Sequence, residues 1–66
     1  MPSSAEEHTK LLNAFQRRAK IERAKGILME RHGIGDREAF ERIRTEARAG
    51  RRPLIDVVDE LLAAHG

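Results

Sequence analysis

The sequence predicts a small all-α domain, with one long helix followed by two short helices. Apolar residues recur at spacings of three and four, as the helical repeat of 3.6 residues requires. No stretch alternates polar and apolar residues with the period of two that indicates a half-buried strand. Glycines near residues 33–35 and at position 50 divide the pattern, so the 66 residues separate into three helical segments.

The first helix is expected to run from about Ala5 to about His32. Ser4 and Glu7 have the spacing of a capping box, in which two side chains bond the free N–H groups at a helix start. No proline or turn pair interrupts this segment before Gly33, which suits the left-handed position after a helix end. We therefore expect a disordered tail at residues 1–4 and a single helical domain at 5–66, with its core at about 12–62.

The second helix is expected to begin at Asp36, because Asp36 and Glu38 place acids in its first turn, where the helix dipole favours negative charge. It is expected to end near Ala49, with Gly50 as its terminator. Pro53 suits the first position of a third helix, since its fixed φ matches the helical value and its missing N–H is not needed there. We expect the last four residues, 63–66, to fray.

The apolar faces of the three segments predict one shared core. Each helix would turn a stripe of aliphatic residues toward the other two, and the polar residues would remain in solvent. The predicted core residues are Ile21, Ala24, Ile27, Leu28, Phe40, Ile43, Ala47, Leu54, Val57, Val58 and Leu61.

Charge is distributed unevenly along the chain, although the formal net charge is only +2. Residues 17–25 contain five bases and one acid, and residues 42–52 contain another five bases and one acid. The last thirteen residues contain three acids and no lysine or arginine. Basic segments of this kind can follow a phosphate backbone, but a solvated helix face with i,i+4 ion pairs is the commoner fate of such charge.

Several classes of protein are disfavoured by composition. There is no cysteine, no apolar run near the roughly 20 residues of a membrane span, and no signal peptide, so we expect a soluble cytoplasmic protein without membrane contact. The three histidines are scattered, and no nucleophile lies near a general base, so we expect no metal, no cofactor and no enzymatic activity. Acids in the first turn of the second helix disfavour a DNA-reading helix.

A glycine inside the first helix is unusual. Gly26 follows Lys25, and Lys25 shares a helix face with Arg18, seven residues earlier. Glycine in a helix interior costs about 1 kcal/mol relative to alanine, so a packing or contact reason is expected. Two reasons are open: close approach of a partner's backbone, or a tight crossing by the protein's own second helix.

The beginning of the first helix carries an apolar stripe that the short domain would not cover. Leu11, Leu12 and Phe15 form this stripe and are candidates for a dimer seam. Two heptads are too few to establish a coiled coil, but a homodimer would also help a chain too short to bury a large core.

The same residues carry a resemblance to a known family. Five runs resemble the ANTAR domain, the RNA-binding domain of transcription antitermination regulators, across about Leu12 to Leu62: Arg18-x-x-Ile21-x-x-Ala24-Lys25-Gly26-Ile27-Leu28-Met29, Arg31-His32-Gly33-Ile34, Glu38-Ala39-Phe40, Ile43-Arg44-x-x-Ala47 and Leu54-x-Asp56-Val57. The resemblance implies a three-helix fold preceded by a helical extension, which agrees with the periodicity.

The resemblance also implies binding to paired RNA hairpins in leader transcripts. Each hairpin has a six-base loop with preferred bases at its first and fourth positions, and binding favours an antiterminator over the overlapping terminator. The positions that match the polar motif of the family are Arg18, Lys25, Gly26 and Arg44. We expect the three cations to meet RNA phosphates or loop bases, and Gly26 to permit close approach.

The chain departs from the family pattern at several positions. Gly35 replaces the usual hydroxyl residue at a helix start, Val58 replaces the usual small residue, and the connection 50–53 is more basic. Family members usually carry a sensory domain, so this chain is a stand-alone member, a fragment, or a protein that depends on a separate sensor protein. An alternative function is a helical dimerisation or protein-interaction module that acts with such a sensor and does not bind RNA.

Overall fold

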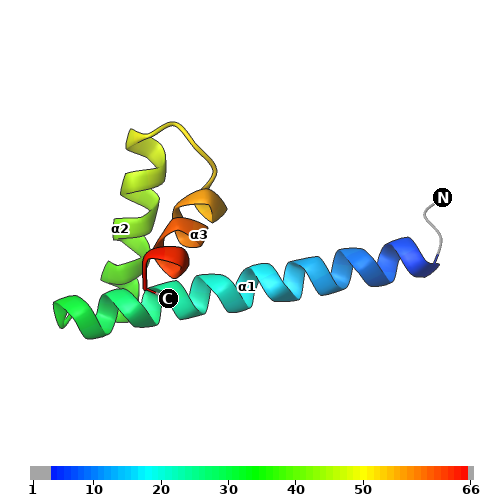
Figure 1. The fold of residues 1–66 in the computed structure, drawn as a ribbon, viewed down its shortest axis with the longest axis horizontal. Coiled ribbons are helices and arrows are strands. Elements are labelled where there is room, and N and C mark those ends of the chain that lie inside the picture. The colour runs from blue at the N-terminus through cyan, green and yellow to red at the C-terminus, as the bar shows by residue number, and fades with distance from the viewer. Residues whose placement is uncertain (1–3, 66) are drawn as a thin grey trace.

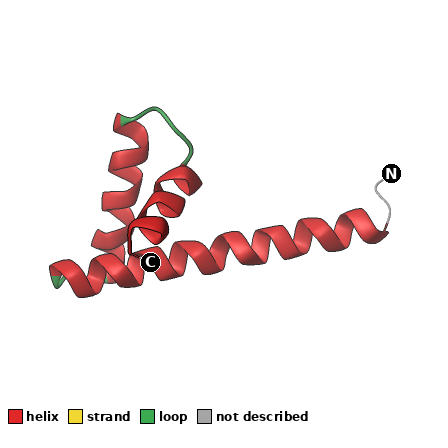
Figure 2. Ribbon diagram, in the orientation of Figure 1, coloured by secondary structure: helices red, strands yellow, loops and turns green. Residues whose placement is uncertain are grey.

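The computed structural model describes residues 4–65, which form three helices: α1 (Ser4–His32), α2 (Asp36–Ala49) and α3 (Leu54–His65). Within these residues the chain contains helices and two short connections and no strand, so the predicted all-α class is confirmed (Figure 2). The first helix begins at Ser4, one residue earlier than expected; the rest of the predicted tail lies outside the described residues.

The C-terminal half of α1 carries the other two helices, while its N-terminal half projects away from them (Figure 1). Both α2 and α3 contact α1 and each other, so the three helices enclose one core at this end of the molecule. Every residue from Ser4 to Lys20 is exposed. The projecting half of α1 therefore buries no side chain, and its contact with α3 is an ion pair at its base, where Nζ of Lys20 lies 3.2 Å from Oδ1 of Asp59.

The core is made of small and medium-sized aliphatic side chains. Its buried members are Ala24 and Leu28 from α1, Ala39, Ile43 and Ala47 from α2, and Val57 and Val58 from α3. Alanine at three of these positions lets the helix backbones approach closely, so that a short chain still excludes water from their contact.

Most of the predicted core is confirmed, but two members are not part of it. Ile21, Leu54 and Leu61 are partly buried and pack against the buried cluster, as expected. Ile27 and Phe40 are only partly buried and lie outside that cluster, and the Phe40 ring lies instead beside Nζ of Lys25. Ala39, which the predicted core omitted, is fully buried.

The α1–α2 turn depends on two glycines with different backbone conformations. Gly33 has φ +63°, the left-handed value that the sequence predicted for the residue after a helix end. Gly35 is the N-cap of α2 with φ −83° and ψ 173°, an extended conformation open to any residue, and it provides no side-chain bond to the helix start. Ile34 lies between them and packs against the core.

The α2–α3 connection ends α2 where the sequence predicted, with Gly50 as its C-cap. Gly50 itself is right-handed, and the left-handed residue is Arg51, with φ 52°. The N–H of Arg51 donates to the Arg48 carbonyl at 3.2 Å, and that of Arg52 donates to the Ala47 carbonyl at 3.0 Å. These two bonds satisfy carbonyls at the helix end, which stabilises a left-handed arginine at a position usually taken by glycine.

Helix α3 differs from expectation at both ends. It begins at Leu54, one residue after the expected Pro53, whose carbonyl accepts the Asp56 N–H at 3.1 Å. It continues through His65, where fraying was expected from residue 63. An ion pair between Arg52 and Glu60 (2.5 Å) joins the connection to α3, and this hydrogen bond holds the pKa of Glu60 below its ordinary value.

We expect the same substitution at the two turn glycines to have opposite effects. Gly33→Ser should lower the free energy of unfolding by about 1 kcal/mol, since serine is strained at a left-handed φ. Gly35→Ser should raise it by a few tenths of a kcal/mol, because the hydroxyl can cap α2. Thermal unfolding followed by circular dichroism measures both, at about 4–8 °C per kcal/mol for a domain of this size. Shifts of the same sign would contradict this account of the turn.

Candidate functional site

Lys25 lies at the junction of α1 and α2, where it connects the two helices. Its Nζ is 2.5 Å from a carboxylate oxygen of Glu22 and 3.0 Å from Oδ2 of Asp36, the first residue of α2. The same Nζ lies 5.9 Å from the centre of the Phe40 ring, within the range of a cation–π contact. The Lys25 side chain is only 13% exposed. It is therefore part of the helix junction, whereas the sequence analysis considered it only as a contact to RNA.

The surroundings of Lys25 favour its charged form. The hydrogen bond to Glu22 is the largest cause, and the hydrogen bond to Asp36 is the second. Together they raise the pKa of Lys25 above its ordinary value of 10.5, against a smaller opposing effect of desolvation. A raised pKa in the folded state means that the ammonium stabilises the fold. This contribution is fully present below pH 10.5 and is lost as the pH rises through the higher pKa of the folded state.

Arg44 lies on the exposed surface of α2, one helical turn beyond Phe40. Its Nη1 is 3.3 Å from a carboxylate oxygen of Glu41, and both side chains are largely exposed. Exposed i,i+3 pairs of this kind contribute little, since water competes for both charges. A phosphate can therefore replace Glu41 with little loss of stability.

Arg18 is exposed on the projecting side of the junction, two turns before Lys25 on α1. Within residues 4–65 it forms no ion pair or hydrogen bond through its side chain. The guanidinium is therefore available to a ligand in this structure, and its planar fork suits the oxygens of a phosphate.

The three predicted cations follow one bent surface across the junction. Helical spacing places Arg18 and Lys25 on one flank of α1, and Phe40 and Arg44 on one flank of α2. The contacts of Lys25 with Asp36 and Phe40 join these two flanks. We call the set Arg18, Lys25, Phe40 and Arg44 the junction surface: its two ends are exposed arginines, and its centre is a lysine held by two carboxylates.

Gly26 is exposed beside the junction surface, on the outer side of α1. A Cβ added at Gly26 would meet no atom within 4 Å outside the surrounding helix backbone. A tight crossing by the second helix therefore does not explain this glycine. Of the two reasons considered from the sequence, close approach of a partner remains.

Sequence reasoning missed the two carboxylates that hold Lys25. Glu22 is three residues before Lys25, a spacing at which helix side chains meet, so this pair was readable from the sequence. Asp36 is eleven residues away and reaches Lys25 only because the turn at 33–35 brings α2 back onto α1. Phe40 was assigned to the core, whereas its ring forms part of a mixed apolar and charged surface.

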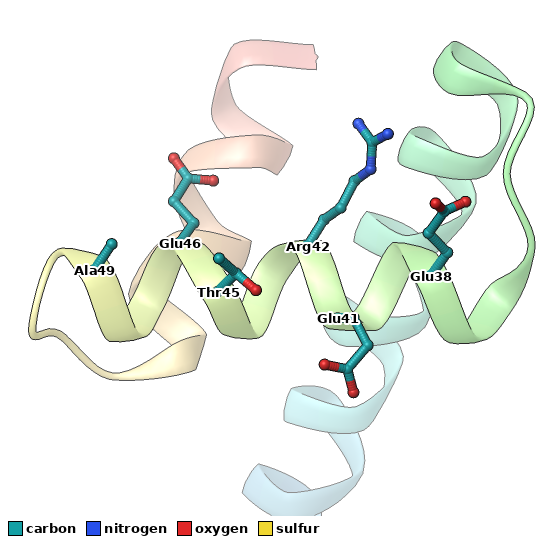
Figure 3. A pocket seen from close by; sticks show the side chains of 6 residues that line it. All are labelled: Glu38, Glu41, Arg42, Thr45, Glu46 and Ala49. Carbon is teal, nitrogen blue, oxygen red and sulfur yellow. The ribbon is translucent and has the colours of Figure 1, made fainter.

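The outer face of α2 has a different character. A shallow hollow of about 370 Å³ is lined there by Glu38, Glu41, Arg42, Thr45, Glu46 and Ala49 (Figure 3). Three carboxylates and one guanidinium make this hollow unsuited to a phosphate. Arg42 projects from this face, so it differs from Arg44 in position while sharing its helix and its chemistry.

Two further features bear on the class of site. The structure between residues 4 and 65 holds no group of three or more histidine or carboxylate side chains placed to bind a metal ion. None of the three described helices has the length and apolar character needed to cross a bilayer.

Leu11 and Phe15, from the predicted dimer seam, are 70% and 77% exposed, and Leu12 is exposed as well.

Comparison with known protein families matches most of this chain to one family. The ANTAR domain family matches residues 9–62. The aliphatic amidase regulator of Pseudomonas aeruginosa is 43% identical over 44 residues, which are 67% of this chain and 22% of that protein. The chain thus corresponds to less than a quarter of the length of this relative. No solved structure is matched.

We expect Lys25 to keep its proton to a higher pH in the folded protein than in the chain unfolded in urea. Glu22→Gln and Asp36→Asn should each lower the pKa of Lys25 toward 10.5, because each variant removes a negative charge and weakens a hydrogen bond that raises this pKa. NMR titration of the lysine Cε resonances measures this, since the chain has only three lysines and Lys25→Arg assigns the signal. Unchanged titration in both variants would show that the two ion pairs do not form in solution.

Proposed function

The chain belongs to the ANTAR domain family, and we propose that it is an RNA-binding transcription antitermination regulator that stabilises a tandem hexaloop hairpin in leader transcripts. The observation that carries this proposal is the family match over residues 9–62, which includes all four polar motif positions. The continuity of the junction surface supports it, because exposed arginines lie at both of its ends.

The proposed mechanism needs no catalysis and no cofactor. A leader transcript can form an antiterminator or a terminator, and a protein that binds one of the two RNA folds more tightly shifts the population toward it. Loop bases are unstacked and exposed, so side chains can reach their edges, whereas the deep major groove of an RNA duplex is closed to them. The proposal places this recognition in the cytoplasm, where transcripts are made.

In this proposal the residues of the junction surface have different roles. Arg18 and Arg44 contact phosphates or loop bases through their guanidinium groups. Lys25 has three N–H donors, of which Glu22 and Asp36 take two, so one remains for RNA. Its main role is to fix α2 against α1, because the angle between the helices sets the distance between the two arginines.

A second candidate function is a dimerisation or protein-interaction module that does not bind RNA. The exposed stripe of Leu11, Leu12 and Phe15 favours it, since contiguous apolar patches usually mark interaction sites. The ion pairs of Lys25 also favour it, because they reduce the free positive charge of the surface. In this second function the chain would act with a separate sensor protein.

We expect Arg44→Ala to weaken binding to a tandem hexaloop hairpin RNA by about tenfold, as loss of one charge-assisted contact implies. Arg42→Ala is the matched control, since it removes the same charge from the acidic face of the same helix. Binding is titrated at two salt concentrations, beside an RNA with scrambled loops, and the salt dependence should fall with Arg44→Ala.

Equal losses in the two arginine variants would mean that only net charge matters, and the junction surface would not be the contact. Weak binding of the wild-type protein to both RNAs would favour the interaction module. The mass of the protein in solution is recorded at the same concentration, so that absence of a required dimer is recognised.

We expect Gly26→Ala to change the stability of the fold and its affinity for RNA in opposite directions. Alanine should raise the free energy of unfolding by about 1 kcal/mol, because it favours the helix and the structure has room for its Cβ. If RNA approaches α1 closely at this position, the same variant should bind more weakly although it is more stable. Unchanged RNA affinity in the stabilised variant would remove Gly26 from the proposed contact.

A further inference from the structure

Two adjacent arginines in the α2–α3 connection have opposite environments. Arg52 is partly buried and pairs with Glu60, and its side chain passes over Gly50, where an added Cβ would lie 3.3 Å from Nε of Arg52. Arg51 is exposed, and its side chain forms no ion pair or hydrogen bond with any residue between 4 and 65. The connection therefore anchors one arginine against the fold and leaves the other in solvent.

The backbone of Arg51 is strained. Its φ of 52° is a left-handed value that glycine adopts at no steric cost and that crowds a residue with a Cβ. The bond from its N–H to the Arg48 carbonyl holds this conformation. A strained residue whose side chain has no contact within the fold is a candidate for a contact outside it.

Arg51 extends a row of arginines along one flank of α2. At 100° per residue, Arg37, Arg44 and Arg48 lie within an arc of about 40° on this helix. Glu41 lies in the same arc and pairs with Arg44, whereas the side chains of Arg37 and Arg48 have no such partner in the described part of the chain. The flank therefore has an excess of positive charge, and Arg51 adds to it just beyond the helix end.

This row begins at the junction surface and leads away from α1. Arg44 belongs to both, and Arg48 lies one helical turn further, at about 6 Å. Arg48 is twelve residues beyond Asp36, so it lies about 18 Å from the start of α2. The α2–α3 connection is at the end of α2 away from α1 (Figure 1). We call Arg48 and Arg51, at this far end, the distal arginines.

The other outer surfaces of α2 and α3 are unfavourable to a polyanion. Helix α3 contains Asp56, Asp59 and Glu60 and no lysine or arginine. The hollow on the outer face of α2 is lined by three carboxylates and one guanidinium. A phosphate chain that reaches the junction surface therefore has one favourable direction over these two helices, along the row of arginines.

We propose that the distal arginines bind phosphates in the stem of an RNA hairpin whose loop is bound at the junction surface, an inference that rests on the proposed function. The deep major groove of an RNA duplex is closed to side chains, so this contact reads the backbone and is independent of base sequence. A duplex rises by about 3 Å per base pair, so Arg48 meets the stem about six base pairs from the loop. The protein would then select hairpins by stem length as well as by loop sequence.

The test compares RNAs that differ in stem length. Both carry the same two six-base loops, on G–C stems of about four or about ten base pairs, which end before and after the expected contact. The wild-type protein should bind the long-stem RNA about tenfold more tightly at low salt, with about threefold from each distal arginine.

Arg48→Ala should weaken binding of the long-stem RNA about threefold and leave the affinity for the short-stem RNA unchanged. The same loss should appear on long stems with scrambled loops, and the salt dependence should fall by about one released ion. Arg42→Ala is the matched control, since it removes the same charge from the other face of α2 and should not change the ratio of the two affinities.

Arg51 gives a variant in which a loss of binding cannot be a loss of folding. Arg51→Gly removes the cation and relieves the left-handed strain, so the melting temperature should rise by about 4 °C while the long-stem affinity falls about threefold. Arg51→Lys should keep most of the affinity, because a lysine ammonium also binds phosphate.

Equal wild-type affinities for the two stem lengths, or equal effects of Arg48→Ala and Arg42→Ala on the long stem, would overturn this inference. Loop-dependent binding in the same titrations would show that the proposed function survives. If the wild-type protein binds neither RNA better than its scrambled-loop counterpart, the proposed function fails. A long-stem preference that is lost in Arg48→Ala would still support the distal contact in that case.

Discussion

The close approach of three helices over Ala24, Ala39 and Ala47 is the constraint on which the rest of the structure depends. Small side chains at the crossing points let a chain of 66 residues exclude water from one core. Because that core occupies only the C-terminal half of α1, the other half must project (Figure 1). The same close crossing leaves the larger Phe40 at the side of the α1–α2 junction, where its ring meets Lys25.

The local features were predictable from sequence because each depends on residues close in the chain. Periodicity gave the three helices, and Gly33 has the left-handed backbone that its position after α1 implied. The role of Lys25 was not predictable in the same way, since Asp36 reaches it only through the angle between α1 and α2. Ile27 and Phe40 show the same limit: apolar spacing identifies a helix face, but only the packing angle decides which side of that face is buried.

Charge counts alone also misjudge the candidate site. The two basic segments were compatible with a phosphate-binding surface or with ion-paired helix faces, and in the structure Lys25 is held by two carboxylates and Arg44 is near Glu41. These pairs differ in physical character: Arg44 and Glu41 are both exposed and separate easily, whereas Lys25 is mostly covered and joins two helices. A phosphate ligand would therefore compete for the arginines at the ends of the surface and leave the central lysine in its structural contacts.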